Sequence, residues 1–304
     1  MIVAVTGATG YIGRFVVAQL QQHHVQVRTL ARPSTNQTGF AAPLTWINGT
    51  LSDVAALTQL VEGVDAVVHL AYEHIPGRYR GGEGDDLAGW LDANVQGTLQ
   101  LLLAARAARV KKFIFLSSRA VFSSTEAGRE LDETHPISPN THYGAYKAAI
   151  EAFLRSFASV EGMQTVSVRA TGVYGLTHPP ERSKWYALVA AVLRGEQVTT
   201  RRGGTEVHGV DVARTIWALL SQSEITTDIV HLSDLYVTHR QLVELVQEIS
   251  GIDGALPQPP AQPPSNMLVC RSIKTLGIEL GGKQRLHNTL KELVTVVRTQ
   301  PNIN

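Results

Sequence analysis

The sequence has little of several features that define whole classes of protein. Cys270 is its single cysteine, so no disulfide can form within the chain, and a reducing, cytoplasmic location is the simplest expectation. The net charge is +1 and neither sign forms a long run, which argues against a nucleic-acid or membrane-surface partner. No apolar stretch approaches the ~18 residues that a membrane span needs. The 11 histidines are scattered without metal-ligand spacing, so we predict no metal site.

The chain does have a glycine-rich turn close to its start. Residues 3–13 read V-A-V-T-G-A-T-G-Y-I-G, an apolar strand followed by glycines at the spacing G-x-x-G-x-x-G. We expect Gly7 to make a tight turn, Gly10 to let a phosphate approach the backbone, and Gly13 to let the next helix pack closely. A helix N-terminus offers unpaired N–H groups and a partial positive charge, so the pattern predicts a dinucleotide pyrophosphate site. An ordinary strand–turn–helix is the alternative.

Strand-like and helix-like segments alternate along the first part of the chain. Apolar, β-branched runs predict strands at residues 2–6, 25–30, 44–47, 66–70, 112–117 and 165–169, of which the first five read as buried on both faces. Helical patterns predict helices at residues 12–22, 53–61, 87–108 and 143–160. The alternation predicts an α/β fold with a Rossmann-type, doubly wound parallel sheet.

The pattern changes after Gly175, and we expect two parts. Residues 1–175 are predicted to form the dinucleotide-binding Rossmann domain, which carries the catalytic residues. Residues 176–304 are predicted to form mainly a smaller substrate-binding lobe, with some segments returning to the first domain. Its predicted elements are helices at 185–194, 239–249 and 286–297 and a strand at 228–232.

A second group of residues suggests acid–base chemistry. Tyr143 and Lys147 are four residues apart, so on a helix they share one face. A nearby ammonium favours the phenolate and brings the pKa of a tyrosine toward the working pH. Ser117 and Ser118 end an apolar strand, at the sheet edge where doubly wound folds bind ligands, and a hydroxyl there can bond a substrate oxygen. An exposed Tyr–Lys pair and a plain strand-ending turn are the alternatives.

Together these motifs resemble the extended short-chain dehydrogenases/reductases, the NAD-dependent epimerase/dehydratase group, over nearly the whole length. The resemblance rests on the segments T-G-A-T-G-Y-I-G (6–13), V-V-H-L-A (67–71), N-V-Q-G-T (94–98), S-R-A-V-F (118–122), D-E-T-H-P (132–136) and H-G-V-D-V-A (208–213). It implies a catalytic set of Ser118, Tyr143 and Lys147, with Lys147 also holding the nicotinamide ribose. It further implies a structural role for Asn94 and a homodimer formed by the helices at 87–108 and 143–160.

The cofactor site departs from an NAD pattern. The second strand ends V-R-T-L-A-R (27–32) without the acidic residue that binds a ribose 2′-hydroxyl. Arg32 would instead meet a 2′-phosphate, which favours NADP over NAD, unless Arg32 only stacks on the adenine. Thr50 stands where the family often has an aspartate near the adenine. The expected cofactor contacts are Gly7, Gly10, Tyr11, Ile12, Gly13, Arg32, Leu51, Leu70, Ala71, Tyr143 and Lys147.

The substrate-binding residues depart from the resemblance as well. Arg119 and Ala120 replace the acidic pair of the sugar dehydratases, which argues against that reaction. Gly172 and Gly204 replace an asparagine and a phosphate-binding arginine of the nucleotide-sugar epimerases, although Arg201 and Arg202 lie close enough in sequence to compensate. The expected substrate contacts are Ser118, Arg119, Tyr143 and Arg202. The glycine-rich loop 75–84 is either a lid or a plain connection.

The sequence is compatible with three functions. The first is an NAD(P)-dependent oxidoreductase that acts on the hydroxyl or carbonyl carbon of a small molecule, with sugar derivatives among the candidates. The second is a nucleotide-sugar 4-epimerase with tightly held NAD. The third is a non-catalytic dinucleotide sensor, which the set of Ser118, Tyr143 and Lys147 argues against, because a sensor needs no acid–base pair.

Overall fold

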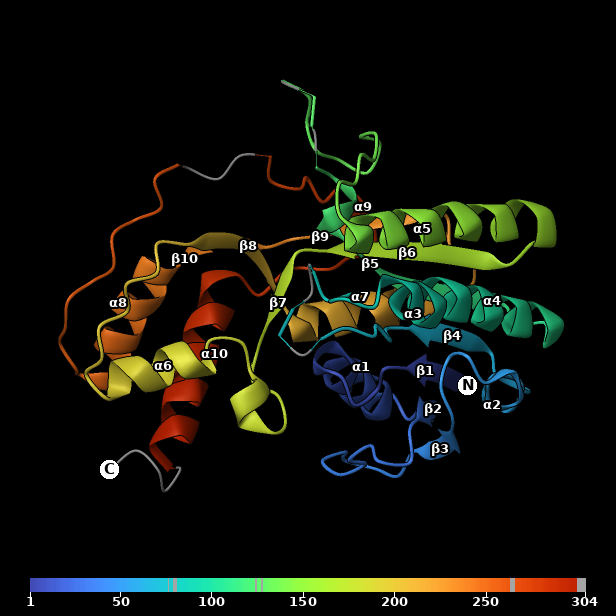
Figure 1. The fold of residues 1–304 in the computed structure, drawn as a ribbon, viewed down its shortest axis with the longest axis horizontal. Coiled ribbons are helices and arrows are strands. Elements are labelled where there is room, and N and C mark those ends of the chain that lie inside the picture. The colour runs from blue at the N-terminus through green and yellow to red at the C-terminus, as the bar shows by residue number, and fades with distance from the viewer. Residues whose placement is uncertain (76, 79–80, 124, 127, 263–265, 300–304) are drawn as a thin grey trace.

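The larger part of the molecule is built on one parallel sheet (Figure 1). The computed structural model describes residues 1–75, 77–78, 81–123, 125–126, 128–262 and 266–299. Seven strands pair in the order β3-β2-β1-β4-β5-β6-β9, and their bounds are β1 Ile2–Thr6, β2 Gln26–Ala31, β3 Thr45–Asn48, β4 Ala66–His69, β5 Lys112–Ser118, β6 Gln164–Ala170 and β9 Ile229–Leu232. The order reverses beside β1, and such a reversal opens a crevice at the carboxyl ends of the strands. The α/β, Rossmann-type prediction is therefore confirmed.

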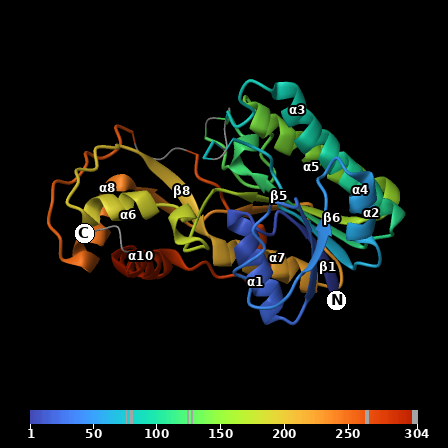
Figure 2. The ribbon, with the colours of Figure 1, turned by 60° about the horizontal axis from the view of Figure 1, so that its bottom comes forward.

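Helices cover both faces of this sheet (Figure 2). α1 (Tyr11–Gln22) and α7 (Gly209–Ser221) pack side by side on one face, whereas α2 (Val54–Val61), α4 (Gly97–Ala107) and α5 (His142–Glu161) cover the other. The alternation of side chains along β1 serves both cores: Val3 and Val5 join the cluster under α1, and Ala4 joins the cluster under α2 and α4. Burial of both faces explains why the central strands are almost entirely apolar.

One long helix is interrupted above the sheet. α3 (Leu87–Leu91) continues through a π-helical turn, Asp92–Gln96, into α4, where the sequence predicts a single helix. Asn94 in this turn is fully buried; its side-chain amide donates to the Glu73 carbonyl and its side-chain oxygen accepts from the Glu73 N–H. The π-helical turn thus positions Asn94 to hold the Glu73 backbone, just after β4, where a cofactor is expected to lie.

The smaller lobe combines a three-stranded sheet with three helices. Its strands are β7 (Gly172–Tyr174), β8 (Gly203–His208) and β10 (Leu235–Thr238), with β8 parallel to β7 and antiparallel to β10. Its helices are α6 (Tyr186–Leu193), α8 (His239–Ser250) and α10 (Gly282–Thr299), and they share an apolar core that includes Leu242 and Leu290. A short helix, α9 (Ser272–Thr275), returns to the large sheet beside β9. None of the helices in the described ranges combines the length and apolar character of a membrane span.

The structure corrects several predictions at the level of single elements. Strands β7, β8 and β10 and the 13-residue helix α7 were not predicted from the sequence. β3 is an edge strand with no fully buried residue, so the expectation that the first five strands are covered on both faces is wrong for it. Of the loop 75–84, residues 76, 79 and 80 lie outside the described residues, and no lid is proposed.

Candidate functional site

The glycine-rich turn is shaped by close approaches between backbone segments. Gly7 has a φ of +75°, and a Cβ there would lie 2.7 Å from the backbone nitrogen of Ala71, beside Leu70. A Cβ on Gly13 would lie 2.0 Å from the Gly7 carbonyl oxygen, so a larger residue at either position is sterically excluded. Gly10 precedes α1 and provides no side-chain cap for its N-terminus. The turn therefore presents the N-terminus of α1 at the carboxyl edge of the sheet, an arrangement that fits a pyrophosphate.

Tyr11 connects this turn to the smaller lobe. Its hydroxyl donates to the carbonyl oxygen of Gly175 at 2.7 Å and accepts from the backbone N–H of Lys184 at 3.2 Å. The sequence suggested Tyr11 only as a cofactor contact, and the structure shows that its side chain bridges the two parts of the molecule. This bridge positions the loop before α6 relative to the glycine-rich turn.

The predicted catalytic residues lie on two adjoining elements. Tyr143 and Lys147 occupy successive turns of α5, and the Lys147 Nζ lies 5.7 Å from the centre of the Tyr143 ring. The Lys147 ammonium donates to the carbonyl oxygen of Leu116 at 2.8 Å, two residues before Ser118 on β5. A Cβ on Gly144 would lie 2.3 Å from the Ala120 carbonyl oxygen, so Gly144 allows the start of α5 to contact the chain just after Ser118. The Ser118 hydroxyl accepts from the Ala120 N–H at 3.1 Å.

Lys147 lies in an aromatic enclosure that changes its acidity. Its Nζ lies within 5.7 Å of the ring centres of Tyr72, Phe115, Tyr143 and Tyr146. Burial lowers the pKa of Lys147 to about 7, although the nearby Glu151 carboxylate acts in the opposite direction. Tyr72, whose ring centre is 4.9 Å from that of Tyr143, was not identified from the sequence. No spacing rule links it to the helix that carries the Tyr–Lys pair.

A buried ionic network lies behind the catalytic strand. Glu151 accepts three hydrogen bonds from Arg169, at 3.0 and 3.3 Å from Nε and at 2.7 Å from Nη2, and both side chains are essentially inaccessible to solvent. The Ser117 hydroxyl also donates to Glu151, so Ser117 is occupied in the core rather than facing the site. Arg169 further contacts His231, and burial followed by this positive charge lowers the pKa of His231 to about 4. The network fixes β5, β6 and α5 relative to one another.

A network of neutral groups lies on the other side of Lys147. His69, at the end of β4, is hydrogen-bonded between the hydroxyls of Thr6, at 2.6 Å, and Thr98, at 2.8 Å. Burial, with the Lys147 charge as a second cause, lowers the pKa of His69 to about 3. A neutral His69 therefore joins β1, β4 and α4 beneath the proposed cofactor position.

The other predicted cofactor contacts surround the ends of the central strands. Leu70 and Ala71 lie against Gly7, and Leu51 packs against Gly97. Arg32, at the end of β2, is largely exposed and lies 3.6 Å from the Glu73 carboxylate. An exposed pair of this kind contributes little to stability, so Glu73 does not fix the position of the Arg32 side chain.

The two arginines predicted to contact substrate are placed differently. Arg119 donates from Nη2 to the backbone carbonyl of Asn266 at 3.0 Å, which ties it to the segment that precedes α9. Arg202 is exposed immediately before β8, and its backbone carbonyl accepts from the His239 N–H at 2.9 Å. The structure therefore places both arginines on segments that flank the site, and their role toward substrate stays a prediction.

A pair of charged residues near β7 was missed by the sequence analysis. The Lys184 ammonium donates to the Glu206 carboxylate, and the two charged ends lie directly over Gly172. Lys184 precedes α6 and Glu206 lies on β8, so no sequence pattern relates them. The register that pairs Gly172 with Glu206 brings them together.

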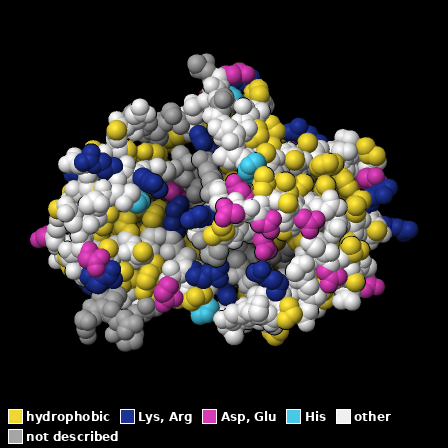
Figure 3. All heavy atoms as spheres, viewed as in Figure 1, with side chains coloured by type: hydrophobic (Ala, Val, Ile, Leu, Met, Phe, Trp, Pro, Cys, Tyr) yellow, Lys and Arg dark blue, Asp and Glu magenta, His cyan; other side chains and the backbone are white. Residues whose placement is uncertain are grey.

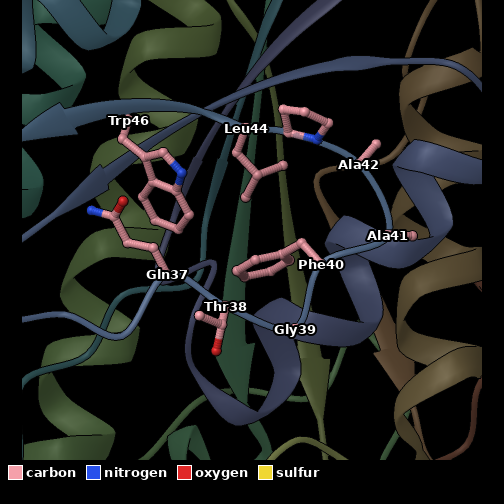
Figure 4. Close-up of a pocket in the computed structure, with 9 residues that line it drawn as sticks. Gln37, Thr38, Gly39, Phe40, Ala41, Ala42, Leu44 and Trp46 are labelled. Atoms are coloured by element: carbon pink, nitrogen blue, oxygen red, sulfur yellow. The ribbon is translucent and has the colours of Figure 1, made fainter.

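The described residues also form a pocket away from these groups. It has a volume of about 280 Å³ and is lined by residues 37–44 and Trp46, with Phe40, Leu44 and Trp46 facing one another (Figure 4). Arg14 of α1 supports its wall, because its guanidinium lies over the Phe40 ring and donates to the Thr38 carbonyl. None of the predicted catalytic residues lines this pocket, so we assign it no part in the chemistry.

Comparison with known proteins identifies the family. The family model described as "NAD dependent epimerase/dehydratase family" matches residues 3–231. The chain belongs to the NAD-dependent epimerase/dehydratase family. It is an enzyme family, which agrees with the arrangement of Tyr143 and Lys147.

Individual relatives are distant. The chain is 29% identical to the UDP-glucose 4-epimerase of Streptomyces lividans over 77% of this chain and 69% of that protein. It is 29% identical to the uronate dehydrogenase of Pseudomonas syringae pv. tomato over 55% of this chain and 59% of that protein. Its fold is similar to that of the Thermotoga maritima UDP-glucose 4-epimerase determined with UDP-glucose, with a TM-score of 0.82, 24% identity and coverage of 98% and 99% of the two chains.

A further structural relative carries a cofactor. The Thermus thermophilus UDP-glucose 4-epimerase, determined in complex with NAD, has a TM-score of 0.79 and 25% identity, covering 98% of this chain and 99% of that one. The residues of this chain fit such a group, because Gly7 and Gly13 allow no side chain near the N-terminus of α1 and Lys147 places an ammonium beside the strand ends. Within the described residues, no cluster of three or more His, Cys, Asp or Glu side chains is placed to hold a metal ion.

Proposed function

We propose that the protein is an NAD(P)-dependent oxidoreductase that acts on the hydroxyl or carbonyl carbon of a small, sugar-like substrate. The observation that carries the proposal is the pairing of Tyr143 with a buried Lys147 beside the strand end at Ser118. A nicotinamide cofactor, when bound, supplies or accepts the hydride. The cofactor-binding role of residues 1–175 and the mainly substrate-binding role of residues 176–304 belong to the same proposal.

The three side chains have distinct tasks in this proposal. The Tyr143 hydroxyl moves a proton to or from the substrate oxygen, and the Lys147 ammonium favours its phenolate form. The Ser118 hydroxyl holds the same oxygen by a hydrogen bond, so that its position is fixed while the proton moves. The backbone at Gly144 packs closely against Ala120, just after Ser118. This contact keeps the Ser118 and Tyr143 hydroxyl groups on adjoining segments.

The test is the substitution Tyr143→Phe. It removes the proton donor and keeps the ring of Tyr143 and the other expected cofactor contacts, so we expect turnover to be lost and cofactor affinity to stay nearly unchanged. Tyr146→Phe is the matched control, since Tyr146 is a buried tyrosine on the same helix whose hydroxyl contacts Thr98 at 3.3 Å. Retention of more than about a tenth of wild-type kcat by the Tyr143 variant would refute the acid–base role.

A nucleotide-sugar 4-epimerase is the second candidate, and the relatives favour it. Both structural relatives described above are UDP-glucose 4-epimerases, and one was determined with UDP-glucose. An epimerase returns the hydride to the opposite face, so its cofactor shows no net turnover. NAD retained through purification would support epimerisation, and freely exchanging cofactor would support the oxidoreductase.

We further propose that NADP is preferred to NAD. Arg32 offers a guanidinium at the end of β2 that can bind a 2′-phosphate through two hydrogen bonds. The proposal rests on this residue alone, because the family as a whole is NAD-dependent and the Thermus thermophilus relative holds NAD.

A homodimer is the last part of the proposal. Leu91, Leu103, Phe153 and Val160, on α3, α4 and α5, are all exposed. Figure 3 shows hydrophobic side chains gathered on the face over these helices. Covering them with the same face of a second copy removes a large apolar surface from water.

A further inference from the structure

The carboxylate of Glu206 occupies the space between two glycines. A Cβ on Gly172 would lie 2.5 Å from one of its oxygens and 2.6 Å from the Lys184 Nζ. A Cβ on Gly204 would lie 3.1 Å from the other oxygen. These are the two glycines that depart from the epimerase pattern, where an asparagine and an arginine are expected. The ion pair of Lys184 and Glu206 fills the volume that those two side chains would occupy.

This pair lies between the catalytic strand and the glycine-rich turn. Ala170 pairs with Ser118 in the large sheet, and Gly172 follows two residues later, which places its Cα within about 12 Å of that of Ser118. The backbone N–H of Lys184 bonds to Tyr11 at the start of α1. Lys184 and Glu206 are therefore held on segments that adjoin both the catalytic strand and the glycine-rich turn.

The surroundings hold the pair in place. Glu206 is almost buried, with 8% of its side chain exposed, whereas Lys184 remains 33% exposed and is accessible to a ligand. Trp185, directly after Lys184, has a φ of +70°, a strained conformation for a bulky residue, and its ring stacks on Tyr174. Strain of this kind persists where surrounding contacts fix a functional segment.

We infer that Lys184 and Glu206 form a specificity element that binds hydroxyl groups of an uncharged polyol or free sugar and excludes a diphosphate. The inference rests on the proposed oxidoreductase function. The carboxylate accepts hydrogen bonds from hydroxyls and the ammonium has donors left for hydroxyl oxygens, so a vicinal diol satisfies both. A diphosphate fits the pair less well, because the Lys184 ammonium is already bonded to the Glu206 carboxylate and that carboxylate repels a second anion at the same place.

Positive side chains flank the pair of Lys184 and Glu206 on both sides. Burial lowers the pKa of His239 and the charges of Arg202 and Lys184 act in the same direction, so Arg202 lies near the pair on the side of the smaller lobe. Arg182 donates to the Thr9 carbonyl at 3.5 Å, and burial together with the Arg182 charge lowers the pKa of Arg14. Arg182 therefore lies beside the glycine-rich turn, where cofactor phosphates are expected, and Arg14 lies close enough to Arg182 for their charges to interact. The pair of Lys184 and Glu206 carries no net charge.

Calorimetric titration of UDP and UDP-glucose into the protein loaded with its preferred nicotinamide dinucleotide is the first arm of the test. We expect a Kd weaker than about 1 mM for wild type, and a gain of at least about tenfold in Glu206→Gln, which removes the charge and keeps the shape. Glu196→Gln is the control, because Glu196 is an exposed carboxylate paired with Arg194 in the same lobe. A micromolar Kd for wild type, or no gain in Glu206→Gln, would overturn the inference.

Turnover of free aldoses and alditols, followed by nicotinamide absorbance, is the second arm. Glu206→Gln should raise KM for the best substrate by at least about tenfold and change kcat by less than about threefold, and Glu196→Gln should change neither. An unchanged KM in Glu206→Gln would also overturn the inference. Absence of any turnover that depends on Tyr143 contradicts the proposed function instead, and the calorimetric arm then still decides whether diphosphate is excluded.

Discussion

Replacing Lys147 with methionine should change how the stability of the cofactor-free protein depends on pH. Burial lowers the pKa of Lys147 from 10.5 to about 7 in the folded protein. The unfolded chain keeps the ordinary lysine pKa, so between pH 7 and about 10 it binds one more proton than the folded chain. The free energy of unfolding therefore rises with pH across this window. Below pH 7 both states are protonated, and this contribution becomes constant.

The expected magnitude follows from the size of the pKa shift. Each pH unit inside the window contributes about 1.4 kcal/mol, so between pH 7 and pH 9 wild type should gain about 2 to 3 kcal/mol from this one group. Lys147→Met has no proton to lose and should lack this gain. It should also lower cofactor affinity and turnover, because it removes the charge beside Tyr143 and the proposed ribose contact.

Urea unfolding at several pH values, without cofactor, measures the effect as the difference between wild type and Lys147→Met. Lys291→Met, on the exposed side of α10, is the matched control and should follow the wild-type pH profile. If the curves of wild type and Lys147→Met ran parallel from pH 6 to pH 9, Lys147 would keep its ordinary pKa, and the argument from burial would be wrong.

Three further substitutions test other parts of the structure. Arg32→Ala should weaken NADP(H) by about 1.5–3 kcal/mol and barely change NAD(H), as measured by titrating both cofactors; equal weakening of the two would leave Arg32 as an adenine-stacking residue. Arg169→Met leaves the Glu151 carboxylate buried without its partner and should cost about 3–5 kcal/mol in the free energy of unfolding, whereas an effect below 1 kcal/mol would show that the site admits water. Light scattering at micromolar concentration should give a dimer for wild type and a monomer for Phe153→Glu; a monomeric wild type would exclude the dimer.

The large sheet was predictable because its signals are local and repeated. The strands β1, β4, β5 and β6 supply buried, largely apolar runs, and the turn at Gly7 follows the first run directly. The positive φ of Gly7 and the close packing of Gly13 confirm the roles expected from their spacing. In the same way, spacing alone placed Tyr143 and Lys147 on one helix.

The environment of these residues was not predictable, because it depends on contacts between distant segments. The aromatic enclosure of Lys147 combines residues from the loop after β4, from β5 and from α5. Tyr72 in that loop directly precedes Glu73, whose backbone is bonded to Asn94. Ser117 and Ser118 look equivalent in sequence. The pleat turns Ser117 toward Glu151 in the core and leaves Ser118 at the edge, where its hydroxyl accepts from the Ala120 N–H.

The residues that distinguish the two candidate functions lie in the elements that were hardest to predict. The proposed acid–base chemistry of Tyr143 and Lys147 serves an oxidoreductase and an epimerase equally well, so the choice between them depends on what the smaller lobe accepts. β7 has three residues and begins with Gly172, and β8 begins with two glycines, so neither gives a periodic signal. The loss of side chains at Gly172 and Gly204 was visible in the sequence and suggested only missing contacts. The strand register changes that interpretation. It brings the Glu206 carboxylate into the space beside Gly172 and Gly204, so in our inference this space does not merely lack a phosphate contact but disfavours a phosphate.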